Sequence, residues 1–112
     1  MKMSFTDYDH ITVLTLSGEF TTEDTDQFQR GVQDRIKSGA KDVLVDCGYL
    51  EFVDSVGLEN WLRLQEDLGM TGGQLRLVNP EESIKKILEL TRLDLAFESH
   101  ETVEEAVKSL RR

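Results

Sequence analysis

The sequence contains one cysteine, one proline and two histidines among 112 residues. Cys47 has no partner for an internal disulfide, and together with His10 and His100 it supplies too few ligands for a zinc centre. We therefore expect neither a disulfide nor a metal site. We expect Cys47 to be a small buried hydrophobic residue, and the single tryptophan, Trp61, to belong to the core.

Long apolar runs are also missing. No segment approaches the roughly 20 apolar residues that span a bilayer, and the first ten residues, MKMSFTDYDH, lack the apolar stretch of a secretion signal. We expect a cytoplasmic protein with no direct membrane insertion.

Basic residues are scarce. The chain has 13 lysines and arginines against 22 acidic residues, which gives a net charge of −9. Nucleic acids are bound by dense basic surfaces, so we expect no nucleic-acid partner. With 38% hydrophobic residues, a chain of this length can bury roughly two thirds of its unfolded surface, and we expect one domain spanning residues 1–112.

The hydrophobic pattern alternates between strand and helix periodicity. We expect an α/β fold of order β-β-α-β-α-β-α-β-α, in which a mixed, mostly parallel sheet carries about four helices and begins with an antiparallel edge hairpin. The apolar run Val43–Val45 suits a central strand covered on both faces. The predicted strands cover residues 5–8, 11–17, 42–47, 74–78 and 96–98, with Gly18 ending the second strand and a loop at 48–53.

Helix starts are predicted from capping residues. Thr21 or Thr22 opens the first helix, and Asp54 and Ser55 precede the second. Asn79 caps the third, with Pro80 in its first turn. A final helix is predicted over residues 101–110.

The most informative segment is Phe52-Val53-Asp54-Ser55-Val56-Gly57-Leu58, which places a hydroxyl where a central strand leads into a helix. Partner and ligand sites of open α/β sheets gather at such strand ends. Two interpretations fit. Asp54 and Ser55 are favourable helix caps on stability grounds alone, and a serine at a helix N-terminus can also accept a phosphate that the helix dipole stabilises.

An enzymatic interpretation fits less well. A hydrolase nucleophile elbow requires glycine where Val53 stands, and this interpretation needs His100 as a base oriented by Asp94 or Glu98. The Gly72-Gly73 pair lacks the lysine and hydroxyl residue of a P-loop. We expect no catalytic activity and no cofactor.

Five segments in this order and spacing resemble the STAS domains, and among them the stand-alone anti-sigma factor antagonists of bacteria. The resemblance covers almost the whole chain. Its segments are residues 16–20, 43–46, 52–58, 72–79 and 84–93.

The resemblance implies a partner-binding switch. In this family, an anti-sigma factor that is a serine kinase phosphorylates the serine matching Ser55, and a serine phosphatase restores it. The unphosphorylated protein binds the anti-sigma factor and so frees a sigma factor, while ATP enters only with the kinase. Glu51, Asp54 and Glu59 are close to Ser55 in sequence, so a phosphate would add like charge and weaken docking.

The residues expected to contact the partner are Thr21, Thr22, Asp54, Ser55, Leu58 and Glu59. The family commonly has serine or threonine in place of Val56, a small residue in place of Glu59 and aspartate in place of Thr21. These differences also fit a STAS scaffolding subunit of a bacterial signalling or lipid-transport complex that docks without phosphorylation. Both interpretations stay open at this point.

Overall fold

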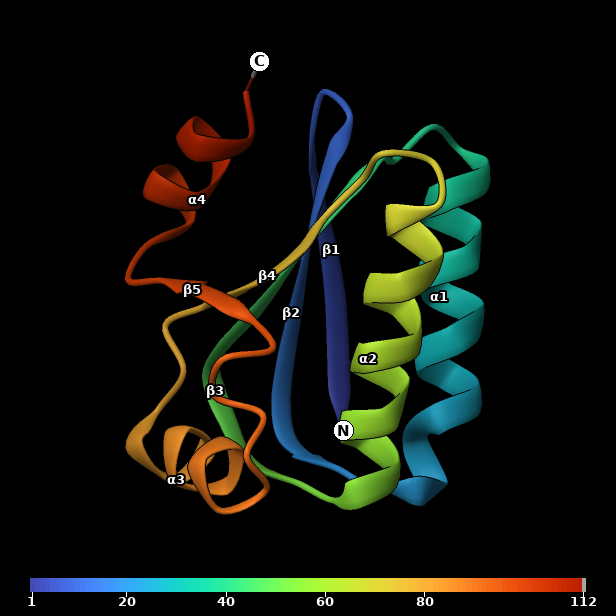
Figure 1. Ribbon diagram of the computed structural model, residues 1–112. Helices are drawn as coiled ribbons and strands as arrows, with labels where there is room; N and C mark the ends of the chain where they lie inside the picture. The colour runs from blue at the N-terminus through green and yellow to red at the C-terminus, as the bar shows by residue number, and fades with distance from the viewer. Residues whose placement is uncertain (112) are drawn as a thin grey trace.

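The structure, a computed structural model, describes residues 1–111 and contains one five-stranded sheet in the order β1-β2-β3-β4-β5 (Figure 1). The strands are β1 Lys2–Tyr8, β2 Ile11–Phe20, β3 Asp42–Val53, β4 Leu75–Val78 and β5 Glu98–His100. The helices are a short 3₁₀ helix, η1 Thr22–Asp24, followed by α1 Thr25–Lys37, α2 Ser55–Gly69, α3 Glu82–Leu90 and α4 Val103–Leu110.

The pairing of the strands confirms the predicted fold class. β1 and β2 form an antiparallel hairpin at one edge of the sheet. The other neighbouring pairs are all parallel, because a helix connects each strand to the next. β3 is the central strand, as predicted.

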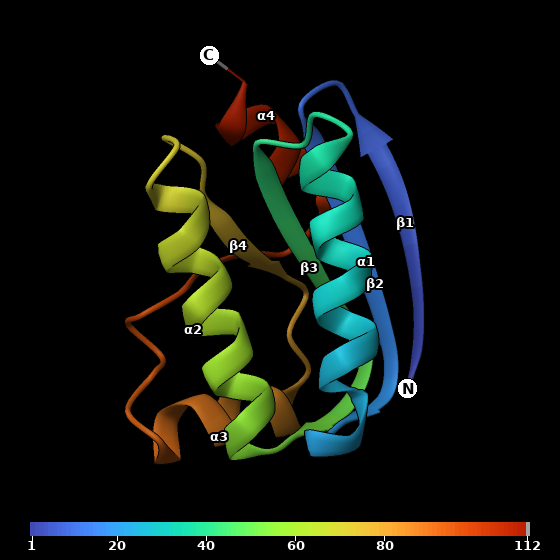
Figure 2. The same ribbon diagram turned by 90° about the vertical axis from the view of Figure 1, so that its right-hand side faces the viewer.

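The core of β3 is buried on both faces. Val43, Leu44 and Val45 are each 0% exposed. Val43 and Val45 point into the larger core beneath α1 and α2, whereas Leu44 points into a smaller core beneath α4. Figures 1 and 2 show α1 and α2 together on one side of the sheet, with α4 on the other. This two-sided burial explains the continuous apolar run in the sequence.

Several strand ends were predicted wrongly, among them the start of β1, which lies at Lys2 and not at residue 5. β3 does not stop at Cys47 but continues through the expected loop to Val53, and β2 continues past Gly18 to Phe20. The two extensions pair with each other, and two register shifts interrupt the pairing. Gly18 has a φ of 88° and lies beside one of these shifts, so it bends the strand and does not end it.

The third helix also starts later than predicted. Asn79 has a φ of 49°, and its N–H donates to the carbonyl of His100 at 2.8 Å. It therefore ends the β4–β5 pairing and turns the chain, and it does not cap a helix. α3 begins at Glu82, with Glu81 in the capping position.

The predicted last strand at 96–98 is shifted by two residues. Phe97 turns into the core, where its ring meets Trp61 edge-on with the centroids 6.1 Å apart. Pairing therefore starts at Glu98. The last helix begins at Val103, not at 101, because the Thr102 hydroxyl caps it by accepting from the Glu105 N–H at 3.2 Å.

Within residues 1–111, no helix has the length and apolar character needed to cross a bilayer.

Candidate functional site

Asp54 joins the start of α2 to the segment that precedes α1. One carboxylate oxygen, Oδ1, accepts from the Gly57 N–H at 2.8 Å and so caps α2. The other, Oδ2, accepts from the N–H and the hydroxyl of Thr22 at 2.8 and 3.0 Å. The predicted site residues Thr22 and Asp54, 32 positions apart, are thus in direct contact.

Hydrogen bonds between Thr21 and Asp24 stabilise the same segment. The N–H and hydroxyl of Thr21 donate to Oδ2 of Asp24 at 3.0 and 3.3 Å, while the Asp24 N–H donates to the Thr21 carbonyl at 2.9 Å. This reciprocal capping arrangement starts η1. The predicted helix start at Thr21 is therefore confirmed, with a 3₁₀ turn standing before α1.

These hydrogen bonds keep Asp54 ionised. Desolvation raises the pKa of the Asp54 carboxyl, but the hydrogen bonds from the Gly57 N–H, from Thr22 and from the Val56 N–H outweigh it and hold the pKa below its ordinary value. A full negative charge therefore lies next to Ser55 at neutral pH.

Ser55 is the first residue of α2 and its side chain is exposed. Its hydroxyl makes no hydrogen bond with any other residue of the described chain, 1–111. Glu51 and Glu59 are exposed on either side of it in sequence. The site thus presents a free hydroxyl in an acidic neighbourhood.

The predicted contact residue Leu58 is placed differently. It is only 3% exposed and packs in the core beneath α2. Of the predicted contact residues, Thr22, Ser55 and Glu59 are exposed, while Thr21 and Asp54 are half-buried. Leu58 anchors α2 from within.

Gly57 has a steric role that sequence reasoning missed. A Cβ at this position would lie 2.7 Å from Cγ2 of Val53 and 3.2 Å from both Cδ2 and the carbonyl oxygen of Phe20. Only glycine lets the first turn of α2 approach the ends of β2 and β3 this closely. A glycine three residues after the capping aspartate was the signal available in the sequence.

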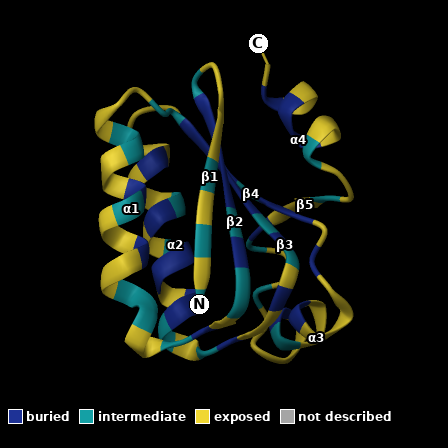
Figure 3. Ribbon diagram, turned by 180° about the vertical axis from the view of Figure 1, so that it is seen from behind, coloured by how far each residue is buried: buried dark blue, intermediate teal, exposed yellow. Residues whose placement is uncertain are grey.

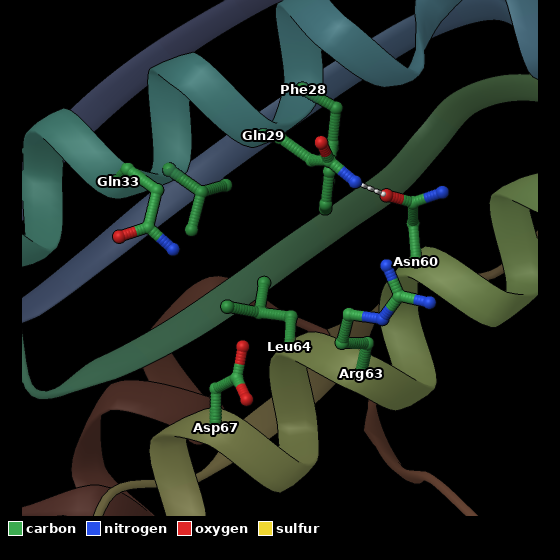
Figure 4. A pocket seen from close by; sticks show the side chains of 8 residues that line it. Phe28, Gln29, Gln33, Asn60, Arg63, Leu64 and Asp67 are labelled. Carbon is green, nitrogen blue, oxygen red and sulfur yellow. Dashed lines mark hydrogen bonds between the residues drawn. The ribbon is translucent and has the colours of Figure 1, made fainter.

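Asn60 is a second residue that was missed. It is 8% exposed, and its amide donates to the Val56 carbonyl and accepts from Gln29 Nε2, both at 2.8 Å (Figure 4). This pair crosses a groove of about 240 Å³ between α1 and α2. The groove is smaller than the roughly 300–1,000 Å³ of most small-molecule pockets. The Gln29–Asn60 hydrogen bond links α1 and α2 beneath the site.

The parts of the hydrolase arrangement are not brought together. His100 Nε2 lies 3.1 Å from Arg76 and 3.5 Å from the Ser109 hydroxyl, and within residues 1–111 its ring has no hydrogen bond to Ser55, Asp94 or Glu98. Within the same range, no group of three or more His, Cys, Asp or Glu side chains could hold a metal ion.

The two core predictions are confirmed. Cys47 and Trp61 are each 0% exposed. Burial, together with the nearby charge of Asp46, raises the pKa of the Cys47 thiol far above its ordinary value, so this thiol is not a reactive nucleophile.

Comparison with known proteins agrees with the fold. A protein of Thermotoga maritima, provisionally named an anti-sigma factor antagonist, is 27% identical over 105 residues, which cover 93% of each chain. A crystal structure of such a protein from Thermotoga maritima has a TM-score of 0.88 at 25% identity and covers 98% of this chain and 95% of its own. These names describe regulatory proteins and not enzymes.

A third match gives the fold alone. The unphosphorylated form of the anti-sigma factor antagonist SpoIIAA superposes with a TM-score of 0.84 at 23% identity over 98% of this chain and 96% of its own. The phosphorylated form of SpoIIAA, a Bacillus protein, superposes with a TM-score of 0.76 at 23% identity and covers 98% of this chain and all of its own. The sequence profile of the STAS domain matches residues 2–106, and the chain therefore belongs to the STAS domain family.

Proposed function

We propose that this chain is an anti-sigma factor antagonist that is switched by phosphorylation of Ser55. The observation that carries the proposal is the exposed, unbonded hydroxyl of Ser55 at the first position of α2, held beside an ionised Asp54. The relatives named as anti-sigma factor antagonists support the partner class.

The proposed partner is an anti-sigma factor that is also a serine kinase. In the unphosphorylated state, the start of α2 and the η1 segment dock on this partner, which then releases its sigma factor. The Asp54–Thr22 contact holds the two parts of this surface in one arrangement, so little conformational entropy is lost on binding.

Phosphorylation reverses the docking. The kinase transfers the γ-phosphoryl group of ATP to the Ser55 oxygen, the hydroxyl proton goes to a base of the kinase, and ADP leaves. The phosphate adds nearly two negative charges beside Asp54, Glu51 and Glu59. Burying this group beside the carboxylates costs desolvation free energy that the neutral hydroxyl does not cost, which raises the free energy of the complex, and the partner is released until a serine phosphatase hydrolyses the phosphate.

The proposal is tested by incubating the purified chain with its host's anti-sigma factor kinases and ATP, followed by peptide mass spectrometry. One phosphoryl group on Ser55 is expected, and Ser55→Ala should remove it. Ser83→Ala is the matched control, because Ser83 is an exposed serine in the first turn of α3. It should be phosphorylated on Ser55 as the wild type is.

The same peptide is then measured in protein purified from the host, grown with and without stress. Occupancy that changes with conditions supports the switch. A Ser55 unmodified in every condition and by every kinase would contradict it and would favour the scaffolding subunit that docks without phosphorylation.

A further inference from the structure

The sheet face opposite α1 and α2 is covered by α4 over only one half of its length. α4 covers the part of this face formed by Ile11, Val13, Leu44 and Val78, and Figure 3 shows α4 beside the upper part of the sheet, with α3 at the lower end. Within residues 1–111, α4 does not reach the C-terminal halves of β2 and β3 on this face, and the start of α3 lies beside them. We call this region the open half, and it comprises Thr15, Ser17 and Glu19 of β2 with Tyr49 and Phe52 of β3.

The register places these side chains on one side. Leu16 and Phe20 of β2 and Leu50 and Val53 of β3 point into the larger core, so their neighbours alternate to the opposite face. Ser17 pairs with Tyr49 and Glu19 pairs with Phe52. Residues 17–19 of β2 thus match residues 49–52 of β3, because Glu51 is an extra residue on β3, and this bulge keeps both aromatic rings on the open half.

The two rings are exposed. Tyr49 is 71% exposed and Phe52 is 41% exposed. Tyr49 stands between two hollows, one of about 690 Å³ that reaches Lys2 and Ser4 of β1, and one of about 590 Å³ that reaches Glu81 and Glu82 of α3. An exposed tyrosine between two hollows has the shape of an interface anchor, since aromatic residues that fill pockets dominate binding energy.

The rim of the open half is acidic. Glu51, Glu81 and Glu82 line the hollow on one side of Tyr49, and Glu19 pairs with Phe52, while Lys2 lies in the hollow on the other side of Tyr49. Within residues 1–111, Glu82 is the one of these four glutamates that forms an ion pair, with Lys85 at 3.6 Å. The negative charge of this rim, on a chain of net charge −9, disfavours a second copy of the same chain and favours a partner surface rich in lysine and arginine. An arginine or lysine of the partner can also stack on the Tyr49 ring.

The open half and the start of α2 are linked by the C-terminal end of β3, although they lie on opposite faces of the sheet. Phe52 lies three residues before Ser55, at the point where β3 leads into α2. We propose that the open half is the second part of the docking surface and that it binds a basic surface of the same anti-sigma factor, with Tyr49 as its anchor. This inference rests on the proposed function.

The test measures the dissociation constant of the host's anti-sigma factor that binds the unphosphorylated wild-type chain. Tyr49→Ala should weaken binding at least tenfold, and Glu51→Gln with Glu81→Gln should slow association and flatten its salt dependence. Met70→Ala is the control, because Met70 is 83% exposed but follows the far end of α2, roughly 20 Å along the helix from Ser55. It should bind within twofold of wild type.

The possible outcomes separate the two proposals. Equal affinity of Tyr49→Ala and Met70→Ala, with Ser55→Asp still blocking binding, would overturn the open half and leave the switch intact. Sedimentation of both variants tests whether a second copy of the chain occupies the open half. A dimer that Tyr49→Ala dissociates without changing partner affinity would also overturn the proposed role of the open half. If no anti-sigma factor of the host binds the wild type, the proposed function fails and this inference fails with it.

Discussion

The position of Ser55 depends on two neighbouring residues, Gly57 and Asp54. Gly57 lets the first turn of α2 lie against Val53 and Phe20, and Asp54 accepts hydrogen bonds both from the Gly57 N–H in this turn and from Thr22 in the segment before α1. The exposed Ser55 lies between these two constraints. Its position is therefore set by its neighbours, while its own hydroxyl is free to react.

At Gly57 we predict that Gly57→Ala lowers the free energy of unfolding by about 1–3 kcal/mol, because the added methyl group overpacks against a β-branched side chain and backbone. The higher helix propensity of alanine offsets at most about 1 kcal/mol. Urea unfolding measures the change.

Gly69→Ala is the matched control within α2, because nothing lies within 4 Å of a Cβ at Gly69. This variant should be as stable as wild type or up to about 1 kcal/mol more stable. A Gly57→Ala variant that matched it would contradict the steric role of Gly57.

At the scale of the elements, Asp54 couples α2 to η1. Because its folded pKa is lowered, the carboxylate contributes stability that is complete above its unfolded pKa of 3.8 and is lost as the pH falls through the folded value. We therefore predict that Asp54→Asn is less stable than wild type at pH 7 and that the difference shrinks as the pH falls below about 4.

Urea titrations between pH 7 and pH 3 measure this difference. Asp94→Asn is the control, since Asp94 is exposed and is without a hydrogen bond or ion pair in the described part of the chain, and its stability should follow wild type at each pH. A constant gap between Asp54→Asn and wild type across the range would show that the carboxylate charge plays no part.

The order and type of the elements could be predicted from the sequence, but several of their ends could not. Periodicity located β3 because Val43–Val45 is buried on both faces. It missed the extension to Val53 because two register shifts break the alternation there, and the partner residues lie on β2, more than 30 positions away. The start of the third helix was predicted wrongly for a related reason. Asn79 has a preference for helix capping, but its backbone hydrogen bond to β5 competes with that preference.

The same distinction between local features and long-range contacts applies to the candidate site. The sequence located Ser55 and the capping role of Asp54 from local spacing, and the contact between Asp54 and Thr22 agrees with the predicted grouping of those residues. The burial of Leu58 and the Gln29–Asn60 contact depend on how α1 and α2 pack together, which no local pattern reports. Tyr49 was missed because its segment was predicted to be a loop.

At the scale of the whole molecule, the two proposed docking surfaces lie on opposite faces of the sheet at the C-terminal end of β3. One is the start of α2 with Ser55, and the other is the open half with Tyr49. The chain has a net charge of −9. A phosphate at Ser55 therefore adds negative charge to a region of the surface where carboxylates are already close together.

The most direct test of this account is the dissociation constant of the host's anti-sigma factor for three forms of the chain: unmodified, Ser55→Ala and Ser55→Asp. We predict that the unmodified chain and Ser55→Ala bind with similar affinity, and that Ser55→Asp binds at least a hundredfold more weakly. Equal affinity of Ser55→Asp and Ser55→Ala for the partner would contradict the central claim that charge at Ser55 controls docking.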